Sequence, residues 1–147
     1  MEYVIAAVLV VGTLFLHFAA LRYLAHRIKE EARIFQRPLL VVVLTLFIMH
    51  LVEVQLFATG FYALEWLGAG TLDTLDARGD IPASDFFYFS IACYTTLGIG
   101  DIVPHGGARF LAGVEALNGL VLITWSASFT YLMMERLWAG EIGPIAD

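Results

Sequence analysis

Long uninterrupted runs of apolar residues dominate the pattern of hydrophobic and polar positions along this chain. The three longest runs cover residues 3–21, about 38–67 and 110–134. At about 1.5 Å of helix per residue, each run is long enough to cross a hydrocarbon layer about 30 Å thick. The first run carries no charge, and the other two carry only isolated glutamates. The pattern therefore predicts three transmembrane helices.

A fourth apolar stretch, residues 83–94, lies between the second and third runs. At about 12 residues it is too short to span the membrane, so it predicts a re-entrant helix that enters and leaves through one membrane face. Pro82 precedes the stretch, and Ser84 or Asp85 is expected to cap its N-terminus. The stretch leads directly into the sequence TTLGIGDIVP at residues 95–104.

The composition agrees with a membrane protein and excludes several other classes. Hydrophobic residues make up 60% of the 147 residues and charged residues only 15%, against about 25% in an ordinary soluble domain. The mean hydropathy is +0.80. These values exclude disordered and disulfide-rich proteins, and the length favours one domain without an appended soluble module. The net charge of −6 argues against a nucleic-acid binder, and the single cysteine, Cys93, cannot form a disulfide within the chain.

The basic residues indicate how the chain is oriented. Five of the 8 Lys and Arg residues lie between the first and second apolar runs, at Arg22, Arg27, Lys29, Arg33 and Arg37. Because basic loops stay in the cytoplasm, this connection is expected inside, with the N-terminus outside and the C-terminus cytoplasmic. The acidic segment 65–109, which includes the re-entrant helix, is then external. The first run has no regular ladder of arginines, so a voltage sensor is not expected.

Glycine alternates with apolar residues at positions 97–100, which suggests an unusual backbone. Glycine tolerates positive φ angles, so an alternating segment can turn successive carbonyl groups toward one axis. Irregular backbone at membrane depth is tolerated only where it is buried in protein or lines a water-filled path. Several copies of the segment, arranged as a ring, would present stacked carbonyl oxygens to a dehydrated cation. The Thr96 hydroxyl would add an oxygen at the inner end.

The charges around this segment also favour a cation. The re-entrant helix would direct its C-terminus, the negative end of its dipole, toward the membrane centre. Asp101 would lie at the outer pore mouth, within an acidic segment that concentrates cations. Together these features predict a pathway for cations.

The sequence TLGIGD at residues 96–101 resembles the potassium-channel signature TVGYG. The order of outer helix, pore helix, filter and inner helix matches as well. Three further motifs, HLVE at 50–53, YFS at 88–90 and EALNG at 115–119, resemble small bacterial ion-channel proteins of the two-transmembrane pore-domain superfamily. The resemblance implies an all-α membrane protein of the cell (inner) membrane, with three transmembrane helices, a re-entrant pore helix and a selectivity-filter loop.

The resemblance also divides the chain and implies a function. Residues 1–37 would form an N-terminal transmembrane helix and basic cytoplasmic loop, residues 38–138 the pore domain, and residues 139–147 a short cytoplasmic tail. The implied function is a passive potassium-selective channel, a homotetramer around a fourfold axis in the lipid bilayer. K⁺ would be the permeant ion, with no organic cofactor, nucleic acid or small-molecule substrate.

The resemblance assigns the filter position by position. The backbone carbonyls of residues 96–99 and the Thr96 hydroxyl would bind K⁺. The whole filter would comprise Thr96, Leu97, Gly98, Ile99 and Gly100.

The third apolar run would be the inner helix of the pore. Gly119 resembles the hinge glycine of the family's inner helix. The residues expected to line the inner cavity are Leu120, Ile123 and Ala127.

The filter region departs from the family pattern at two places. Ile99 stands where the family has Tyr or Phe, so no aromatic hydroxyl is expected to tie the filter to the pore helix. The tryptophan collar of the family is absent, with Phe86, Phe87 and Phe89 in its place. These departures leave a weakly selective or Na⁺/K⁺ cation channel as the alternative function.

Ionisable residues inside the apolar runs are candidates for filter support or gating. Glu53 lies near mid-membrane, where a charged carboxylate costs about 2.5 kcal/mol or more, so it must be protonated, paired or facing water. His50 shares its helix face, and the two are either a proton-sensitive gate or filter brace, or a structural hydrogen-bonded pair. Glu115 is expected to support the pore helix near Tyr94 or Thr95, or else to bond another span.

Two other classes of protein compete with the channel hypothesis. An intramembrane enzyme would use the histidines, but no metal-ligand spacing such as HExxH is present, and we expect no enzyme. His17, alone in the first run, is interpreted as an interhelical histidine rather than a metal ligand. The second class is a non-conducting membrane interaction protein.

Overall fold

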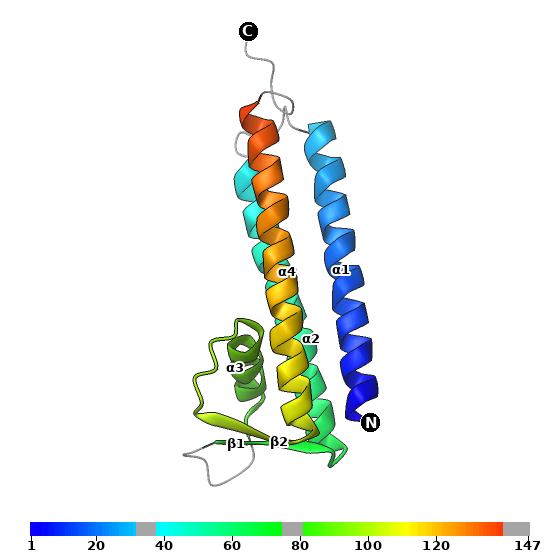
Figure 1. The fold of residues 1–147 in the computed structure, drawn as a ribbon, viewed down its shortest axis with the longest axis vertical. Coiled ribbons are helices and arrows are strands. Elements are labelled where there is room, and N and C mark those ends of the chain that lie inside the picture. Colours follow the sequence, from blue (N-terminus) through cyan, green and yellow to red (C-terminus); the bar gives the residue numbers. More distant parts are fainter. Residues whose placement is uncertain (32–37, 75–80, 140–147) are drawn as a thin grey trace.

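The computed structural model describes residues 1–31, 38–74 and 81–139. These residues form, in chain order, α1 (Glu2–Glu31), α2 (Pro38–Trp66), β1 (Gly70–Thr74), α3 (Ala83–Tyr94), β2 (Ile102–Gly106) and α4 (Gly107–Trp138). The three long helices pack along one another, whereas the short α3 and both strands lie at the end of the bundle that carries the N-terminus (Figure 1). This is the predicted arrangement of three long helices and one short helix.

Each long helix contains a stretch that is long and apolar enough to cross a membrane. Within the described residues there are 3 such candidate spans, Glu2–Arg27, Leu39–Trp66 and Gly107–Trp138. The three spans confirm the fold class predicted from the apolar runs. The chain is therefore a multi-pass membrane protein.

The basic connection between the first two spans differs from the prediction. α1 continues well past the apolar run, so Arg22 and Arg27 lie on a helix rather than in a loop. Arginine, lysine and glutamate favour helices, and the helix therefore extends beyond its apolar part. Arg33 and Arg37 lie outside the described residues.

α3 has the predicted bounds, Ala83–Tyr94, but not the predicted cap. Pro82 is the N-cap residue, and no side chain caps the helix. The Ser84 hydroxyl instead donates to the Asp85 carboxylate at 3.2 Å. The prediction is wrong because the extended backbone of Pro82 starts the helix there, so that Ser84 and Asp85 already lie within the first turn.

Two short strands, which the hydropathy pattern does not predict, join the end of α2 to the start of α4. β1 and β2 pair antiparallel, from Gly70 opposite Gly106 to Thr74 opposite Ile102. A Cβ at Gly70 would lie 2.6 Å from the backbone nitrogen of Ala108, so only glycine fits this close approach. The strand pair therefore fixes the segment that follows the predicted filter against the first turn of α4.

The largest buried apolar cluster packs α3 against α2 and α4 and includes Ala6 of α1. The rings of Phe61 on α2 and Phe89 on α3 meet edge to face, with centroids 5.0 Å apart. Phe57 of α2 and Leu111 of α4 are fully buried in the same cluster. This packing wedges α3 between two long helices and so positions the chain that follows it.

Gly70→Ala is expected to lower the free energy of unfolding by about 1–3 kcal/mol, because the added methyl group would overlap the backbone of Ala108. Gly12→Ala is the matched control, since nothing lies within 4 Å of a Cβ at Gly12 and alanine favours a helix. Unfolding of the purified protein in detergent, followed by circular dichroism, measures both effects. Equal stability of Gly70→Ala and the parent protein would contradict the close packing of β1 on α4.

Candidate functional site

The segment after α3, residues 95–101, is irregular backbone of alternating handedness. The φ angles of Thr96, Gly98 and Gly100 are positive, at 59°, 53° and 89°, whereas those of the intervening residues are not. Such alternation turns successive peptide planes so that their carbonyl groups can face one side. Thr96 adopts the left-handed region without being glycine, a strain of about 1–3 kcal/mol that is typical of functional sites.

The backbone amides of this segment are bonded back to the end of α3. The amides of residues 96–98 donate to the carbonyls of Cys93 and Ala92 at 2.9–3.1 Å, and the Thr95 amide donates to Ile91 at 3.1 Å. Within the described residues, the carbonyls of residues 96–98 accept no such backbone bond. Leu97 and Ile99 are 68% and 53% exposed in the single chain. The segment thus has one bonded side and one open side.

The outer end of the segment is also tied to α3. The Tyr88 hydroxyl donates to the Asp101 carboxylate at 2.9 Å, and this hydrogen bond raises the pKa of Tyr88. Ile99 itself offers no hydroxyl, but an aromatic hydroxyl of α3 holds Asp101, the residue directly after the predicted filter. The hydroxyl comes from the helix and the acceptor from the segment, a pairing that inspection of position 99 alone could not find.

Glu115 of α4 is buried against α3 and reaches it one turn earlier than predicted, at Ser90 rather than at Tyr94 or Thr95. The Ser90 oxygen lies 2.5 Å from the Glu115 Oε1 and 2.8 Å from the carbonyl oxygen of Val54 on α2. A hydroxyl has one proton and cannot donate to two acceptors at once. Both contacts are satisfied when Glu115 is protonated and donates to Ser90, which then donates to Val54.

Gly119 lies where α4 crosses the end of α3. A Cβ at Gly119 would lie 2.2 Å from the backbone oxygen of Tyr94, so a side chain would push the two helices apart. α4 runs unbroken through this position. In this structure Gly119 therefore provides a close helix contact directly behind residues 95 and 96.

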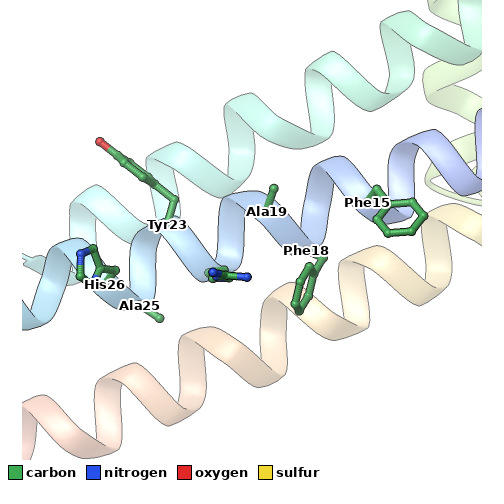
Figure 2. A pocket seen from close by; sticks show the side chains of 7 residues that line it. Phe15, Phe18, Ala19, Tyr23, Ala25 and His26 are labelled. Carbon is green, nitrogen blue, oxygen red and sulfur yellow. The ribbon is translucent and has the colours of Figure 1, made fainter.

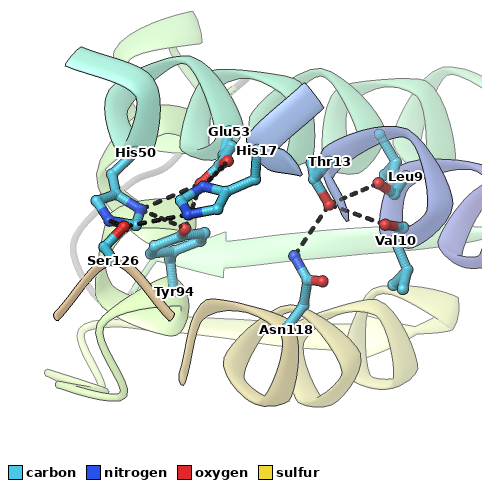
Figure 3. Close-up of polar contacts among 9 residues, drawn as sticks. All are labelled: Leu9, Val10, Thr13, His17, His50, Glu53, Tyr94, Asn118 and Ser126. Atoms are coloured by element: carbon cyan, nitrogen blue, oxygen red, sulfur yellow. Dashed lines mark hydrogen bonds and ion pairs between the residues drawn. The ribbon is translucent and has the colours of Figure 1, made fainter. Parts of the chain in front are cut away.

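A second group of polar residues meets near the middle of the bundle. The Glu53 carboxylate is approached by the Nδ1 atom of His17 at 2.8 Å and the Nδ1 atom of His50 at 3.1 Å. The Tyr94 hydroxyl donates to Glu53 at 2.5 Å and lies 2.8 Å from His50. On the other side of the rings, Ser126 Oγ lies 3.1 Å from the Nε2 atom of His17 and 3.0 Å from that of His50. Figure 3 shows that the five side chains converge from four helices.

The sequence paired His50 with Glu53 but missed the other members of this group. His17 is an interhelical histidine, as predicted, and it is completely buried beside Glu53. A usable signal exists, because each of the three apolar runs carries a polar residue in its interior, namely His17, Glu53 and Ser126. Polar residues at similar depth in neighbouring spans tend to bond one another, since lipid offers no partner.

His17, His50 and Glu53 could also be considered as metal ligands, since their donor atoms lie within 4.8 Å of one another. The separations that join them, 2.8 and 3.1 Å, are hydrogen-bond distances. Ligands of a tetrahedral zinc ion with bonds of about 2.0–2.1 Å would be about 3.3 Å apart. The geometry therefore fits a hydrogen-bonded cluster better than a metal centre.

The other polar residues of α4 divide into two sets. Asn118 donates to the Thr13 hydroxyl of α1 at 3.1 Å, beside the group described above (Figure 3). Thr124 and Ser128 bond carbonyls of their own preceding turn. The predicted cavity residues are exposed in the single chain, at Leu120, Ile123 and Ala127.

A groove runs along α1 at the end away from α3, and Figure 2 shows the side chains that line it. Aromatic rings, including Phe15 and Phe18, make up one part, and Arg22 adds a positive charge. Apolar rings next to an arginine suit contact with lipid chains and headgroups. The groove has no part in the geometry of residues 95–101.

Comparison with known proteins assigns the central part of the chain. Residues 49–136 match a family model described as "Ion channel". The match includes α3, the irregular segment and nearly all of α4, and it begins within α2. No solved structure matches the chain.

Two curated relatives are named potassium channels. The chain is 31% identical over 105 residues to the inward rectifier potassium channel Kirbac3.1 of Paramagnetospirillum magnetotacticum. This aligned region covers 71% of this chain and 35% of that protein. It is 32% identical over 112 residues to the voltage-gated potassium channel KCNC3 of Homo sapiens. That aligned region covers 73% of this chain and 14% of the human protein. The chain therefore spans about a third of the first relative's length and less of the second.

The proton count at Ser90 predicts that Glu115 is a neutral acid. Glu115→Gln is expected to change the free energy of unfolding by less than about 0.5 kcal/mol, because a glutamine amide donates to Ser90 in the same way. Ser90→Ala is expected to cost about 1–3 kcal/mol, since it leaves the buried Glu115 carboxyl group without a hydrogen-bond partner.

Infrared spectroscopy of the protein in lipid tests the protonation directly. A carbonyl band from the protonated Glu115 carboxyl group is expected in the parent protein, and Glu115→Gln should remove this contribution to the spectrum. A parent spectrum in which this variant removes only carboxylate bands would show that Glu115 is ionised and refute the prediction.

Proposed function

This chain belongs to the ion channel family whose model it matches over residues 49–136, and we propose that it is a passive potassium-selective channel. K⁺ would pass through the backbone carbonyls of residues 96–99. The observation that carries the proposal is the alternating φ of residues 96, 98 and 100, combined with amides that are bonded back to α3. This arrangement leaves the carbonyl oxygens available to replace the hydration shell of a cation.

The position of α3 supports the same proposal. Its C-terminus adjoins the inner end of the filter, and the negative end of its dipole would favour a cation there. At the outer end, Asp101 adds a carboxylate that Tyr88 holds in place. The filter is thus flanked by negative potential at both ends, which raises the local concentration of cations.

The open side of the filter requires further copies of the chain. One chain contributes one filter segment, so we propose a homotetramer around a fourfold axis in the lipid bilayer. Exposed apolar residues of α4, such as Leu117 and Val121, would pack against neighbouring subunits. Leu120, Ile123 and Ala127 would line the inner cavity, and Gly119 would hold α4 against the filter.

The proposed orientation follows from the ends of the bundle. Arg22 and Arg27 lie toward the end of α1 that is far from α3 (Figure 1). We place this end in the cytoplasm of the cell, with the N-terminus and the outer mouth of the filter outside. The proposed location is the inner membrane.

Ile99 favours a second candidate, a weakly selective Na⁺/K⁺ channel. An isoleucine offers no hydroxyl to brace the filter wall, and a less rigid ring of carbonyls would discriminate less between the two ions. The bond between Tyr88 and Asp101 supplies a brace at the outer end, which is why potassium selectivity is the preferred proposal.

A reversal potential distinguishes the two candidates. The purified protein is reconstituted in planar bilayers with KCl on one side and NaCl on the other. A reversal potential close to the K⁺ equilibrium potential is expected. A reversal near zero would favour the weakly selective channel, and a folded tetramer without current would refute both.

Gly98→Ala is expected to abolish selective K⁺ conduction, because an L-residue at this positive φ costs about 1–2 kcal/mol in every subunit. Gly12→Ala is the control, a helical glycine outside the filter with open space around it. Currents of both variants are compared in the same bi-ionic bilayers. Parent-like reversal potential and conductance in Gly98→Ala would show that ions pass by another route.

A further inference from the structure

The buried group around Glu53 lies outside the proposed ion pathway, yet it joins all four helices. His17 comes from α1, His50 and Glu53 from α2, Tyr94 from α3 and Ser126 from α4. His17 and Glu53 are 0% exposed and Tyr94 1%, so neither water nor lipid compensates their polar atoms. The His50 side chain is 20% exposed, yet both of its ring nitrogens contact other members, so the protons of these hydrogen bonds come from within the group.

Counting contacts against protons shows what the group lacks. Five contacts reach Glu53 or Ser126: both Nδ1 atoms and the Tyr94 hydroxyl contact Glu53, and both Nε2 atoms contact Ser126. A sixth contact joins the Nδ1 atom of His50 to the Tyr94 hydroxyl at 2.8 Å, and one proton on this nitrogen serves it together with the contact to Glu53. Each of the first five contacts needs one proton. Two neutral imidazole rings supply one proton each, and the hydroxyls of Ser126 and Tyr94 supply one each, which makes four.

A fifth proton is missing whichever nitrogen of each imidazole ring carries its proton. If Ser126 donates to His17, then His50 must donate to Ser126 and also to Glu53; if Ser126 donates to His50, the same demand falls on His17. One ring is then an imidazolium facing an ionised Glu53, or Glu53 itself holds the proton. In either form the group has a net charge of zero.

Loss of the fifth proton would leave a buried negative charge and two acceptors facing each other. A carboxylate in this position costs about 2.5 kcal/mol or more. The titratable groups that face the site are His17 on α1, His50 on α2, Tyr94 on α3 and Glu115 on α4, the last acting on Tyr94 electrostatically. Glu115 is neutral by the count at Ser90, so no charge there compensates Glu53.

Tyr94 connects this site to the filter. It is the last residue of α3, and the irregular segment 95–101, which contains the proposed filter, starts with the next residue. Its own backbone oxygen is pressed against Gly119 of α4. A change in the hydrogen bonds of the Tyr94 hydroxyl therefore acts at the point where α3, α4 and the filter meet.

We propose that the His17, His50, Glu53, Tyr94 and Ser126 cluster is a proton-binding site that holds Tyr94 and, through it, the filter in the conducting arrangement. The proposal rests on the channel function proposed above. The proton is bound when the filter has the geometry described here, and its release at raised pH loosens the end of α3 and lowers conduction. The ligand of the site is the proton itself.

The current is measured in planar bilayers with symmetrical KCl at pH values from mildly acidic to alkaline. The mean current of the parent protein is expected to fall at least tenfold as pH rises. In Glu53→Gln the amide supplies the missing proton permanently, so this variant should conduct at every pH without the fall. His105→Gln is the control, since it removes a histidine that faces Asp73 on the strand pair, and it should keep the full response.

Tyr94→Phe separates proton binding from its effect on the filter. Without the tyrosine hydroxyl, four contacts remain and three protons are supplied, so the site still binds one more proton. This variant should therefore keep the binding and release of the cluster's proton but lose the dependence of current on pH. A tenfold response retained in Tyr94→Phe or Glu53→Gln, or lost in His105→Gln, would overturn the proposal.

Solid-state NMR of isotope-labelled histidine in proteoliposomes reads the site without any current. At mildly acidic pH the ring nitrogens of His17 and His50 should show the extra proton or its exchange with Glu53, and raised pH should remove it. Two neutral rings beside an ionised Glu53 at every pH would overturn the proton site. Absence of current at every pH would overturn the channel function, while the NMR result still decides whether the site binds a proton.

Discussion

The structure depends on one constraint, that a polar backbone inside a membrane must have its amides bonded. Residues 95–98 leave helical geometry at membrane depth and satisfy their amides with the last carbonyls of α3. Because those carbonyls are the ones a helix end leaves unpaired, the end of α3 and the start of the filter satisfy each other. The carbonyls of residues 96–98 then accept no backbone hydrogen bond from the described part of the chain, which leaves them free for the proposed filter. The proposed filter therefore needs a short helix in front of it, held at a fixed depth.

The fixed depth of α3 explains the costly polar residues in the long helices. α3 is attached in its middle by Tyr88 to Asp101 and by Ser90 to α2 and α4, and at its end by Tyr94. Apolar packing in a membrane holds helices weakly, because lipid is as apolar as a leucine side chain. Burial of each carboxyl group thus costs free energy, and the hydrogen bonds by which that group fixes one turn of α3 offset the cost. Gly119 completes this arrangement by letting α4 approach closely.

The sequence predicts those features that depend on a single segment. The spans, the bounds of α3 and the backbone chemistry of the filter are visible because run length and glycine positions are local properties. The pairing of β1 with β2 is invisible, because its strands are five residues long, contain Gly70 and Pro104, and meet only after the chain has passed through α3. The partners of Glu115 and His17 are missed for a related reason. Hydropathy gives the depth of a residue in the membrane but not the direction in which it faces around its helix.

The missed partners change how α1 should be understood. α1 lies outside the matched region, yet Thr13 and His17, four residues apart on one face, bond Asn118, Glu53 and Ser126 on the two neighbouring helices. With His17 absent, Glu53 would lose one of its three partners, and Ser126 would lose one of two. α1 is therefore an integral part of the fold around the filter, and its two polar residues set both its rotation and its depth against the pore helices.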